Sequence, residues 1–284
     1  MHPPRILITG ASGYLGHSTM IEAAARGEAI GTYFAHRPTG PLDTIVHLNL
    51  LNPDMIRDVV ARTKPTAIIH TAAAIPGAPP HTFDAVNHLG ALAVAAQAAA
   101  HNIRLVHVST DVVHDGTAAP YKDDATPHPL SDYGRSKAAG EHAVLTVCPA
   151  AAIVRTSLIY GLETIDTGTA GFAARLERGE PLRLFHDVIR QPVHAPDLAA
   201  ALVLLALDHQ DTSGTINVAG SQTLTREEFG RRMLQYWNIG GQDRIEPVAA
   251  AQISTEIPLD LRLSLDRARS LGLPLTGVDQ ILDR

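Results

Sequence analysis

The chain has 284 residues, 45% of them apolar and 18% charged, which is ordinary for a folded protein with a sizeable core. Its formal charge of −6 argues against a nucleic-acid-binding surface, and its single cysteine, Cys148, excludes an internal disulfide framework. The N-terminus does not resemble a signal peptide, and the longest apolar run, residues 198–207, is half of what a bilayer crossing requires. These properties predict a cytoplasmic protein with no nucleic-acid or membrane partner. They leave the oligomeric state open, with a homodimer as one option.

In the first 155 residues, short runs rich in Ile, Val and Leu alternate with longer Ala-rich segments. This alternation is typical of βα units whose parallel sheet is covered by helices on both faces. We expect strands at residues 5–9, 29–34, 45–48, 67–70, 103–108 and 151–154, and helices at residues 14–26, 53–62, 82–101 and 133–146. The sequence therefore predicts an α/β fold with a doubly wound (Rossmann) parallel sheet in residues 1–160.

After Gly161 the rhythm changes to Gly/Thr-rich loops and shorter elements. We expect a helix near residues 170–178, a strand pair at residues 182–185 and 191–193, and a helix at residues 197–207. No linker is long enough to make this part independent. Residues 161–284 are therefore predicted to form a smaller C-terminal α+β substrate lobe packed closely on the first domain.

The segment "ILITGASGYLG", residues 6–16, places Gly10, Gly13 and Gly16 between the first strand and the first helix. Glycines allow a tight turn and a close approach of the backbone to a pyrophosphate, whose charge is met by the amides at the helix N-terminus. Tight packing between strand and helix would explain one or two glycines. Three at this spacing favour a dinucleotide site.

Dinucleotide folds that bind NAD usually have an acidic residue at the end of the second strand. The corresponding segment here is "TYFAHRPTG", residues 32–40, with His36 and Arg37 and no carboxylate. A guanidinium suits the 2′-phosphate of NADP, so NADP is favoured over NAD. The alternative is that Arg37 is a solvated loop charge, which would leave the choice of cofactor undecided.

The stretch "LSDYGRSKAAGE", residues 130–141, places Tyr133 and Lys137 four residues apart at the start of a helix and therefore on one face. A neighbouring ammonium is expected to lower the pKa of the phenol. Tyr133 could then give a proton to a carbonyl oxygen whose carbon receives a hydride. A Tyr-x-x-x-Lys pair alone is more often a surface pair.

The order of the motifs makes the catalytic interpretation stronger. Ser109 and Thr110 follow the strand predicted at residues 103–108, and the carboxyl ends of strands in a doubly wound sheet face the bound cofactor. We expect these two residues to present a hydroxyl beside the phenol of Tyr133. Asp111 is interpreted as a turn residue.

At this point the sequence resembles the extended short-chain dehydrogenase/reductase superfamily and, within it, the dTDP-4-dehydrorhamnose reductase-like branch of sugar-nucleotide reductases and epimerases. The resemblance covers nearly the whole chain, through motifs that occur in the order of the family: "GASGYLG", "IIHTAAA", "AVNHLGALAVA", "VSTDVVHDG", "DYGRSKAAGE", "IVRTSLIYG" and "RQPVHAPDLA".

The resemblance implies a role for each residue of the predicted site. Thr110 polarises the substrate oxygen, Tyr133 is the general acid, and Lys137 tunes it while binding the nicotinamide ribose. Asn87 has two interpretations, a cofactor contact or a helix-interior amide satisfied by the backbone. The other implied cofactor contacts, in addition to Gly10, Gly16 and Arg37, are Ser12, Gly13, Tyr14, Leu15, Asn49, Leu50, Ala72, Ala73 and Ala74.

The chain departs from the branch at two positions on the substrate side and at one adenine-binding position. Val112 and His114 replace two aromatic residues, and Asn49 stands where the branch has an adenine-binding Asp. Arg190 occupies a position where related enzymes often have a diphosphate-binding arginine, although an arginine in such a loop is usually solvated. We therefore expect a nucleotide-linked keto-sugar as the substrate class without naming the sugar.

The histidines do not point to a metal site. The 15 histidines are scattered without a His-x-x-x-His pair or a cysteine-containing ligand set, so we expect no metal. His186 and His194 are expected to flank the substrate cleft, but lone histidines are more often packing residues and neither is assigned a catalytic role.

Three functions remain open on the sequence alone. The first is an NADPH-dependent reductase of a keto group, an oxidoreductase. The second is an epimerase or dehydratase that keeps its cofactor bound and recycles the hydride. The third is a non-catalytic, NADP-bound regulatory subunit that resembles the beta subunit of methionine adenosyltransferase. Retention of Thr110, Tyr133 and Lys137 argues against the third, because binding alone does not require a tuned phenol.

Overall fold

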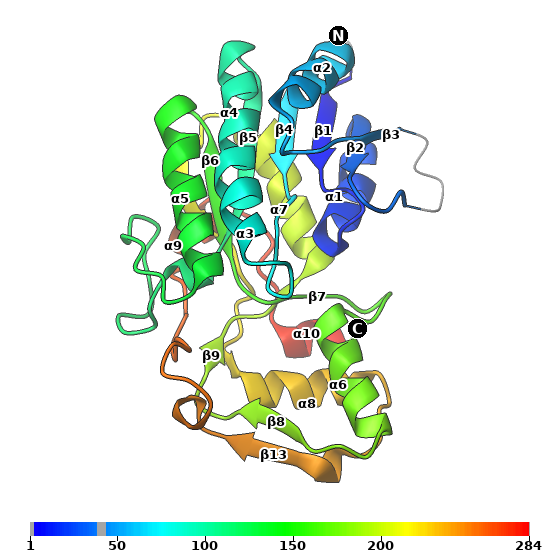
Figure 1. Cartoon of the computed structure of the whole chain (residues 1–284), viewed down its shortest axis with the longest axis vertical. Coiled ribbons are helices and arrows are strands. Elements are labelled where there is room, and N and C mark those ends of the chain that lie inside the picture. Colours follow the sequence, from blue (N-terminus) through cyan, green and yellow to red (C-terminus); the bar gives the residue numbers. More distant parts are fainter. Residues whose placement is uncertain (1–2, 39–43, 284) are drawn as a thin grey trace.

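The computed structural model describes residues 3–38 and 44–283, and its centre is a seven-stranded parallel sheet with the strand order β11-β6-β5-β4-β1-β2-β3 (Figure 1). This order and the parallel pairing confirm the predicted doubly wound fold. The strands are β1 (Arg5–Thr9), β2 (Glu28–Tyr33), β3 (Ile45–His47), β4 (Ala67–His70), β5 (Arg104–Thr110), β6 (Ala152–Thr156) and β11 (Gly214–Asn217).

Helices cover both faces of the sheet. The residues of β1 alternate between them: Ile6 and Ile8 pack in a cluster with α1 (Tyr14–Ala24) and α7 (Ala195–Leu207), whereas Leu7 packs in the opposite cluster. That opposite cluster includes residues of α2 (Pro53–Thr63), α4 (Ala91–Ala100) and α5 (Asp132–Val147). In the described part of the chain, no helix is long and apolar enough to cross a membrane.

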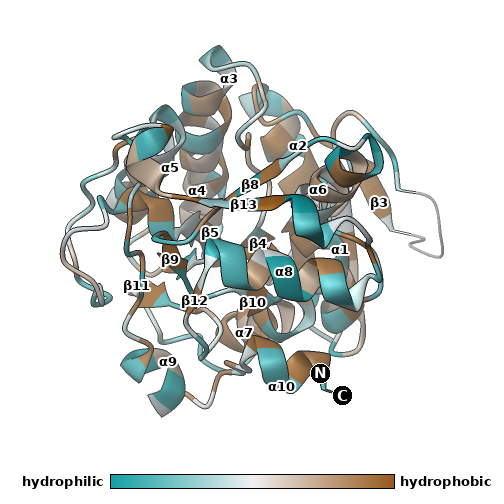
Figure 2. Cartoon of the chain, turned by 90° about the horizontal axis from the view of Figure 1, so that it is seen from below, coloured by the Kyte–Doolittle hydropathy of each residue, from teal (hydrophilic) through white to brown (hydrophobic). Residues whose placement is uncertain are grey.

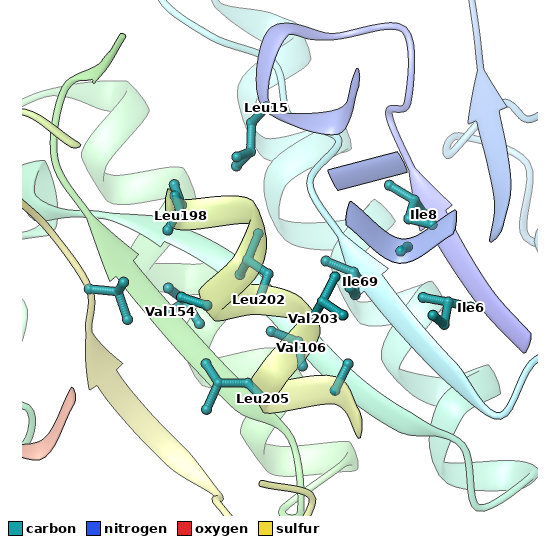
Figure 3. Close-up of a cluster of buried hydrophobic side chains, with 14 of the residues drawn as sticks. Ile6, Ile8, Leu15, Ile69, Val106, Val154, Leu198, Leu202, Val203 and Leu205 are labelled. Carbon is teal, nitrogen blue, oxygen red and sulfur yellow. The ribbon is translucent and has the colours of Figure 1, made fainter. Parts of the chain in front are cut away.

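Helix α7 is the most apolar element of the molecule's core. Figure 3 shows its residues Leu198, Leu202 and Leu205 lying against the strands that carry Val106 and Val154. The three leucines have no exposed surface, which is why the sequence of this helix is hydrophobic on every side. Two elements from beyond residue 160 thus complete the domain expected from residues 1–160. Helix α7 covers one face of the sheet, and β11 adds its edge strand.

The rest of the chain forms a smaller body at the carboxyl edge of the sheet (Figure 1). Its strands pair as β13 (Ile245–Val248) with β8 (Leu182–Phe185), β12 (Leu224–Thr225) with β9 (Ile189–Arg190), and β10 (Val193–His194) with β7 (Ile159–Tyr160). The helices are α6 (Thr167–Glu177), α8 (Arg226–Tyr236) and α10 (Val278–Leu282), with 3₁₀ turns at Gln242–Arg244 and Ala250–Gln252. Helix α9 (Asp266–Ser270) instead packs against β11 of the central sheet.

Three expectations about elements were wrong. The strands at residues 182–185 and 191–193 do not pair with each other, because each finds a partner distant in sequence. The helix expected at residues 82–101 is interrupted: α3 (His81–Phe83) leads into a π-helical segment, Asp84–Gly90, before α4. Strand β5 continues through Ser109 and Thr110, where we had expected it to end at residue 108.

Candidate active site

A cavity of about 680 Å³ lies at the carboxyl edge of the sheet. It is lined by the glycine-rich loop after β1 and by segments that follow β2, β3, β4 and β6. Thr110, at the end of β5, and Tyr133 and Lys137, from α5, complete its wall. Ligands of doubly wound proteins bind at this edge, where the loops between strands and helices converge.

The glycine-rich loop combines two packing glycines with one open glycine. A Cβ at Gly16 would lie 2.1 Å from the carbonyl oxygen of Gly10, and a Cβ at Gly10 would lie 2.7 Å from Cα of Ala72. Gly10 also has a φ of +74°, which favours glycine. At Gly13 the nearest atom to an added Cβ is the Gly10 oxygen at 3.2 Å, a tight contact but a less severe one than at Gly10 and Gly16.

The open glycine stands at the N-terminus of α1. Gly13 is the N-cap residue of this helix, no side chain caps the helix, and its first turn contains no acidic residue. The first backbone N–H groups of α1 and its dipole therefore remain available to an anion. This combination fits the pyrophosphate of a dinucleotide.

Most of the residues predicted to bind the cofactor lie around this cavity. Arg37 does not line it; it is exposed and follows the lining residue His36 by one position. Asn87 does not line it either. The predicted residues that do are Gly10, Ser12, Gly13, Tyr14, Leu15, Gly16, Asn49, Leu50, Ala72, Ala73, Ala74, Tyr133 and Lys137.

Asn87 lies behind the cavity wall and binds the backbone of one of its lining residues, Ala74. Its side-chain oxygen accepts a hydrogen bond from the Ala74 N–H (2.8 Å), and its amide nitrogen donates to the Ala74 carbonyl (2.9 Å) and to the Ser136 hydroxyl (3.0 Å). The amide is 1% exposed, and these bonds use its oxygen and both of its N–H donors. Of the two interpretations, the geometry favours the satisfied interior amide, which fixes the loop that contains Ala74.

Tyr133 lies in the first turn of α5, whose N-cap Ser131 accepts a hydrogen bond from the Gly134 N–H at 3.1 Å. Burial, with a smaller contribution from the Asp111 carboxylate, raises the pKa of Tyr133 to about 12. The Thr110 hydroxyl and the Arg190 guanidinium act in the opposite direction. The phenol is therefore protonated at neutral pH.

Lys137 does not lower the pKa of Tyr133 in this structure, contrary to our expectation. Its ammonium group donates a hydrogen bond to the Val108 carbonyl (2.7 Å) and lies 3.4 Å from Nε2 of His107, so the strand β5 holds it at the floor of the cavity. Burial lowers the pKa of Lys137 to about 8, against the opposing effect of the Glu141 carboxylate.

Ser109 and Thr110 point in opposite directions, as successive residues of a strand do. The Ser109 hydroxyl donates to Glu141 at 2.5 Å, and Arg155 forms a bidentate pair with the same carboxylate, with its shortest contact at 2.7 Å. Only Thr110 is placed to act on Tyr133. The expectation that both hydroxyls would lie beside the phenol is therefore wrong for Ser109.

Asp111 is more than a turn residue. It begins a 3₁₀ turn, Asp111–Val113, but its side chain is fully buried and accepts two hydrogen bonds from Arg190, at 2.6 and 2.8 Å. Arg190 is itself only 12% exposed in its side chain, so it is not the solvated loop arginine of the alternative interpretation. The pair connects the end of β5 to β9.

A further group of polar side chains lies in the sheet beneath the cavity. Nδ1 of His70 is 2.6 Å from the Thr9 hydroxyl, and its ring stacks on that of His107 with centroids 5.1 Å apart. Burial lowers the pKa of His70 to about 3 and that of His107 well below its usual value, with Lys137 acting in the same direction. Both rings are neutral at physiological pH.

Other residues around the cavity were missed by the sequence analysis. His186 and His194 do not line the cavity, and in the described residues no three His, Cys, Asp or Glu side chains are grouped to hold a metal. The missed lining residues lie at or just beyond the carboxyl ends of the strands, so the last residues of each predicted strand and the positions after it were the available signal. They include Thr32, Tyr33, Phe34, Thr71, Ile75, Thr156, Ser157 and Ile159.

Comparison with known families agrees with this geometry. Residues 4–273 match the family described as the RmlD substrate binding domain. The chain belongs to this family. RmlD-type proteins fall within the extended dehydrogenase/reductase superfamily, so the resemblance seen in the sequence is confirmed.

Relatives of this RmlD-family chain cover nearly its whole length. The dTDP-4-keto-6-deoxy-D-glucose reductase of Streptomyces niveus is 32% identical over 262 residues, 88% of this chain and 84% of the relative. Methionine adenosyltransferase 2 subunit beta of Danio rerio is 30% identical over 284 residues, 95% of this chain and 85% of the relative. The crystal structure of dTDP-4-dehydrorhamnose reductase from Bacillus anthracis in complex with NADP superposes with a TM-score of 0.81 at 25% identity, covering 100% of this chain and 98% of that one.

Proposed function

We propose that this protein is an NADPH-dependent reductase of a keto group on a nucleotide-linked sugar. The observation that carries the proposal is a protonated, partly exposed phenol, Tyr133, beside the hydroxyl of Thr110 at the wall of a dinucleotide-sized cavity. A proton donor is what the reduction of a carbonyl to an alcohol requires of the protein. Membership in the RmlD family and the reductase among the relatives support the substrate class.

The loop around Gly13 and the uncapped start of α1 would hold the pyrophosphate of the cofactor. NADPH supplies a hydride when bound. Thr110 donates a hydrogen bond to the substrate oxygen, and Tyr133 transfers its proton to that oxygen as negative charge develops. Lys137 offers donors and positive charge at the cavity floor, where the cofactor ribose would lie.

NADP is the cofactor that the second strand supports best. The residues that follow Tyr33, from Phe34 to Pro38, contain no carboxylate to bind the ribose hydroxyls of NAD. Arg37 is exposed beside the cavity lining and is free of the described ion pairs, so it can meet a 2′-phosphate. The NADP-bound reductase with the same fold supports this choice.

A dehydratase is disfavoured by the state of Asp111. Enzymes of that class usually use an extra carboxylate beside the Thr as a general acid, but both oxygens of Asp111 accept hydrogen bonds from Arg190. The side chain is fully buried in this ion pair, so neither oxygen is free to meet a substrate. Stoichiometric consumption of NADPH separates a reductase from enzymes that recycle the hydride.

The relative from Danio rerio favours a second candidate, an NADP-bound regulatory subunit. Such a subunit needs the cavity but not the chemistry of Thr110 and Tyr133. Tight NADP binding without turnover on any keto-sugar, together with co-purification of a larger enzyme, would support this candidate over the reductase.

The test is NADPH oxidation across nucleotide-linked keto-sugars and small ketones, measured for the wild type and for Tyr133→Phe. We expect the variant to lose about 10²- to 10⁴-fold in rate because it lacks the acid. Its affinity for NADPH should stay within about twofold of the wild type. Tyr236→Phe is the matched control, because Tyr236 is 42% exposed and far from this chemistry in the chain. Unchanged turnover in Tyr133→Phe would contradict the assignment of the acid.

A further inference from the structure

One side chain of the cavity wall connects the two bodies of the molecule. Tyr14 is the first residue of α1 and lines the cavity, and its hydroxyl donates a hydrogen bond to the Thr164 carbonyl at 3.0 Å. Thr164 lies in residues 161–166, the loop between β7 and α6 of the smaller body. Two views at right angles both show α6 on the side of the molecule that carries α1 (Figure 1, Figure 2). The wall at Tyr14 is therefore shared by the glycine-rich loop and the smaller body.

The loop between β7 and α6 accommodates the phenol because its first residue is a glycine. A Cβ at Gly161 would lie 2.5 Å from the Tyr14 hydroxyl oxygen, and the next two nearest atoms, at 3.4 and 3.7 Å, belong to the same ring. Gly161 is not one of the glycines with a positive φ, so its backbone conformation does not itself favour glycine. The missing side chain at Gly161 thus serves the contact with Tyr14.

The hydroxyl of Tyr14 is a lasting donor. Burial, followed by the Asp166 carboxylate, raises the pKa of Tyr14 above its usual value, against the opposing effect of the hydrogen bond to Thr164. The phenol therefore keeps its proton at neutral pH. A single hydrogen bond between neutral groups contributes little net free energy, so this one can open and close as the loop moves.

The place of this hydrogen bond matters for the cofactor. The ring of Tyr14 stands at the uncapped start of α1, where the pyrophosphate of a dinucleotide would lie. Glu163, Thr164 and Ile165 are exposed, so their loop can move without disturbing the core. While the hydroxyl is bonded to Thr164, the ring and the loop close the cavity on this side. Moving the ring out of the wall requires that the bond breaks.

We propose that Tyr14 is a positioning residue that retains the cofactor. Its hydrogen bond to Thr164 closes the wall beside the pyrophosphate, and the dinucleotide leaves when this bond opens. The inference rests on the proposed function, which places NADP or NADPH in the cavity. It gives the smaller body a part in cofactor exchange, a step that a reductase must complete in every cycle and that often limits turnover.

The experiment measures the dissociation rate of NADPH by stopped-flow fluorescence, with an excess of NADP as the competitor. Tyr14→Phe removes the donor and keeps the ring, whereas Gly161→Ala places a methyl group where the hydroxyl lies. Each change should accelerate dissociation about 3- to 10-fold and leave the association rate within about twofold of the wild type. The double variant should be no faster than the faster single variant, because both changes break the same bond.

Two matched controls separate this effect from a general loss of stability. Tyr236→Phe removes an exposed hydroxyl from α8, and Gly171→Ala adds a methyl group to α6, where no described atom beyond its own helix lies within 4 Å of an added Cβ. Both should release NADPH at the rate of the wild type. All variants should unfold within about 3 °C of the wild type, so a faster release would not reflect a weakened fold.

Unchanged dissociation in Tyr14→Phe or in Gly161→Ala would overturn the inference, and so would independent effects that multiply in the double variant. Normal NADPH oxidation on a keto-sugar together with unchanged dissociation would contradict the role of Tyr14 and leave the proposed reductase standing. A wild-type protein that binds neither NADPH nor NADP would contradict both the proposed function and this inference.

Discussion

Lys137 shows how a site residue can reduce the stability of the fold that holds it. Its side chain is 2% exposed, and burial lowers its pKa from 10.5 to about 8. Since each pKa unit corresponds to about 1.36 kcal/mol, keeping this lysine charged at neutral pH costs about 3 kcal/mol. The ammonium stays charged at neutral pH because its lowered pKa of about 8 still lies above 7.

The cost of Lys137 predicts a pH dependence of stability. Between about pH 8 and pH 10.5 the unfolded chain binds more protons at this residue than the folded chain, so its contribution to stability rises with pH. Urea unfolding should show the wild type gaining about 2 kcal/mol relative to Lys137→Met between pH 7 and pH 9.5. The exposed Lys122, changed to Met, is the control. A constant difference between the wild type and Lys137→Met at the two pH values would contradict the shifted pKa.

His70 predicts a loss of folding stability at acidic pH. Its folded pKa of about 3 lies below the unfolded value of 6.5, so it stabilises the fold above pH 6.5 and this contribution is lost as the pH falls toward 3. Between pH 7 and pH 5 the free energy of unfolding should fall by about 2 kcal/mol more in the wild type than in His70→Asn. His142→Asn, at an exposed position of α5, should behave as the wild type. Equal losses in wild type and His70→Asn would show that His70 does not remain neutral.

At this scale the sequence predicted which residues meet but not all of their partners. The spacing of Tyr133 and Lys137 and the position of Thr110 were enough to bring the three together at the cavity. The direction of the Lys137 ammonium depends on the Val108 carbonyl and His107, and no local pattern encodes that choice.

Helix α5 owes its position to a buried ion pair. Arg155 of β6 and Glu141 of α5 are 3% and 5% exposed in their side chains, and Glu141 lies one turn after Lys137. Arg155 also donates to the Ala125 carbonyl at 2.8 Å, which fixes the loop before α5. The ion pair therefore holds helix α5, which carries Tyr133, against β5 and β6.

This arrangement predicts strong coupling between Glu141 and Arg155. Arg155→Met alone should destabilise the protein by about 3–5 kcal/mol, because it leaves a buried carboxylate unpaired. The double change Glu141→Met with Arg155→Met should be less destabilising than Arg155→Met alone, which a double-mutant cycle from urea unfolding would measure. Arg135→Met breaks an exposed pair on the same helix and should change stability by less than about 1 kcal/mol. Additive effects at positions 141 and 155 would contradict the coupling.

The elements themselves were predictable where hydrophobic runs are long. The six strands expected in the first domain exist within a few residues of the expected bounds. The π-helical segment, Asp84–Gly90, could not be foreseen, because Asn87 at its centre is fixed by bonds to Ala74 and Ser136, which only tertiary packing brings close. Two-residue strands such as β9 and β10 have no periodicity to detect.

At the scale of the whole molecule, the chain returns from the smaller body to the central sheet through α7 and β11. This return ties the two bodies together. Helix α7 buries its leucines against the sheet, and β11 pairs with β6 in the parallel register Gly214↔Ala152 to Asn217↔Arg155. These long-range pairings lie beyond what periodicity alone can predict, so the sequence indicated two lobes without showing how they interleave.

The shared layer predicts that a chain ending at residue 160 will not fold. It would lack α7, which covers one face of the sheet together with α1, and β11, which pairs with the edge of β6. We expect no cooperative thermal transition by circular dichroism and no NADP binding, whereas the full chain should show both. A cooperative, NADP-binding fragment would show instead that residues 1–160 are an autonomous domain.

The interleaving also limits where this protein can vary during evolution. The segment around β8 and β9 leaves the sheet after β6 and returns to it through α7 and β11, so it is anchored at both ends. Insertions or deletions within this segment would reshape the part of the smaller body that covers the substrate. The strand order of the central sheet would stay unchanged. A lineage could therefore acquire new sugar preferences through loop changes while the central sheet and its nucleotide-binding edge stay unchanged.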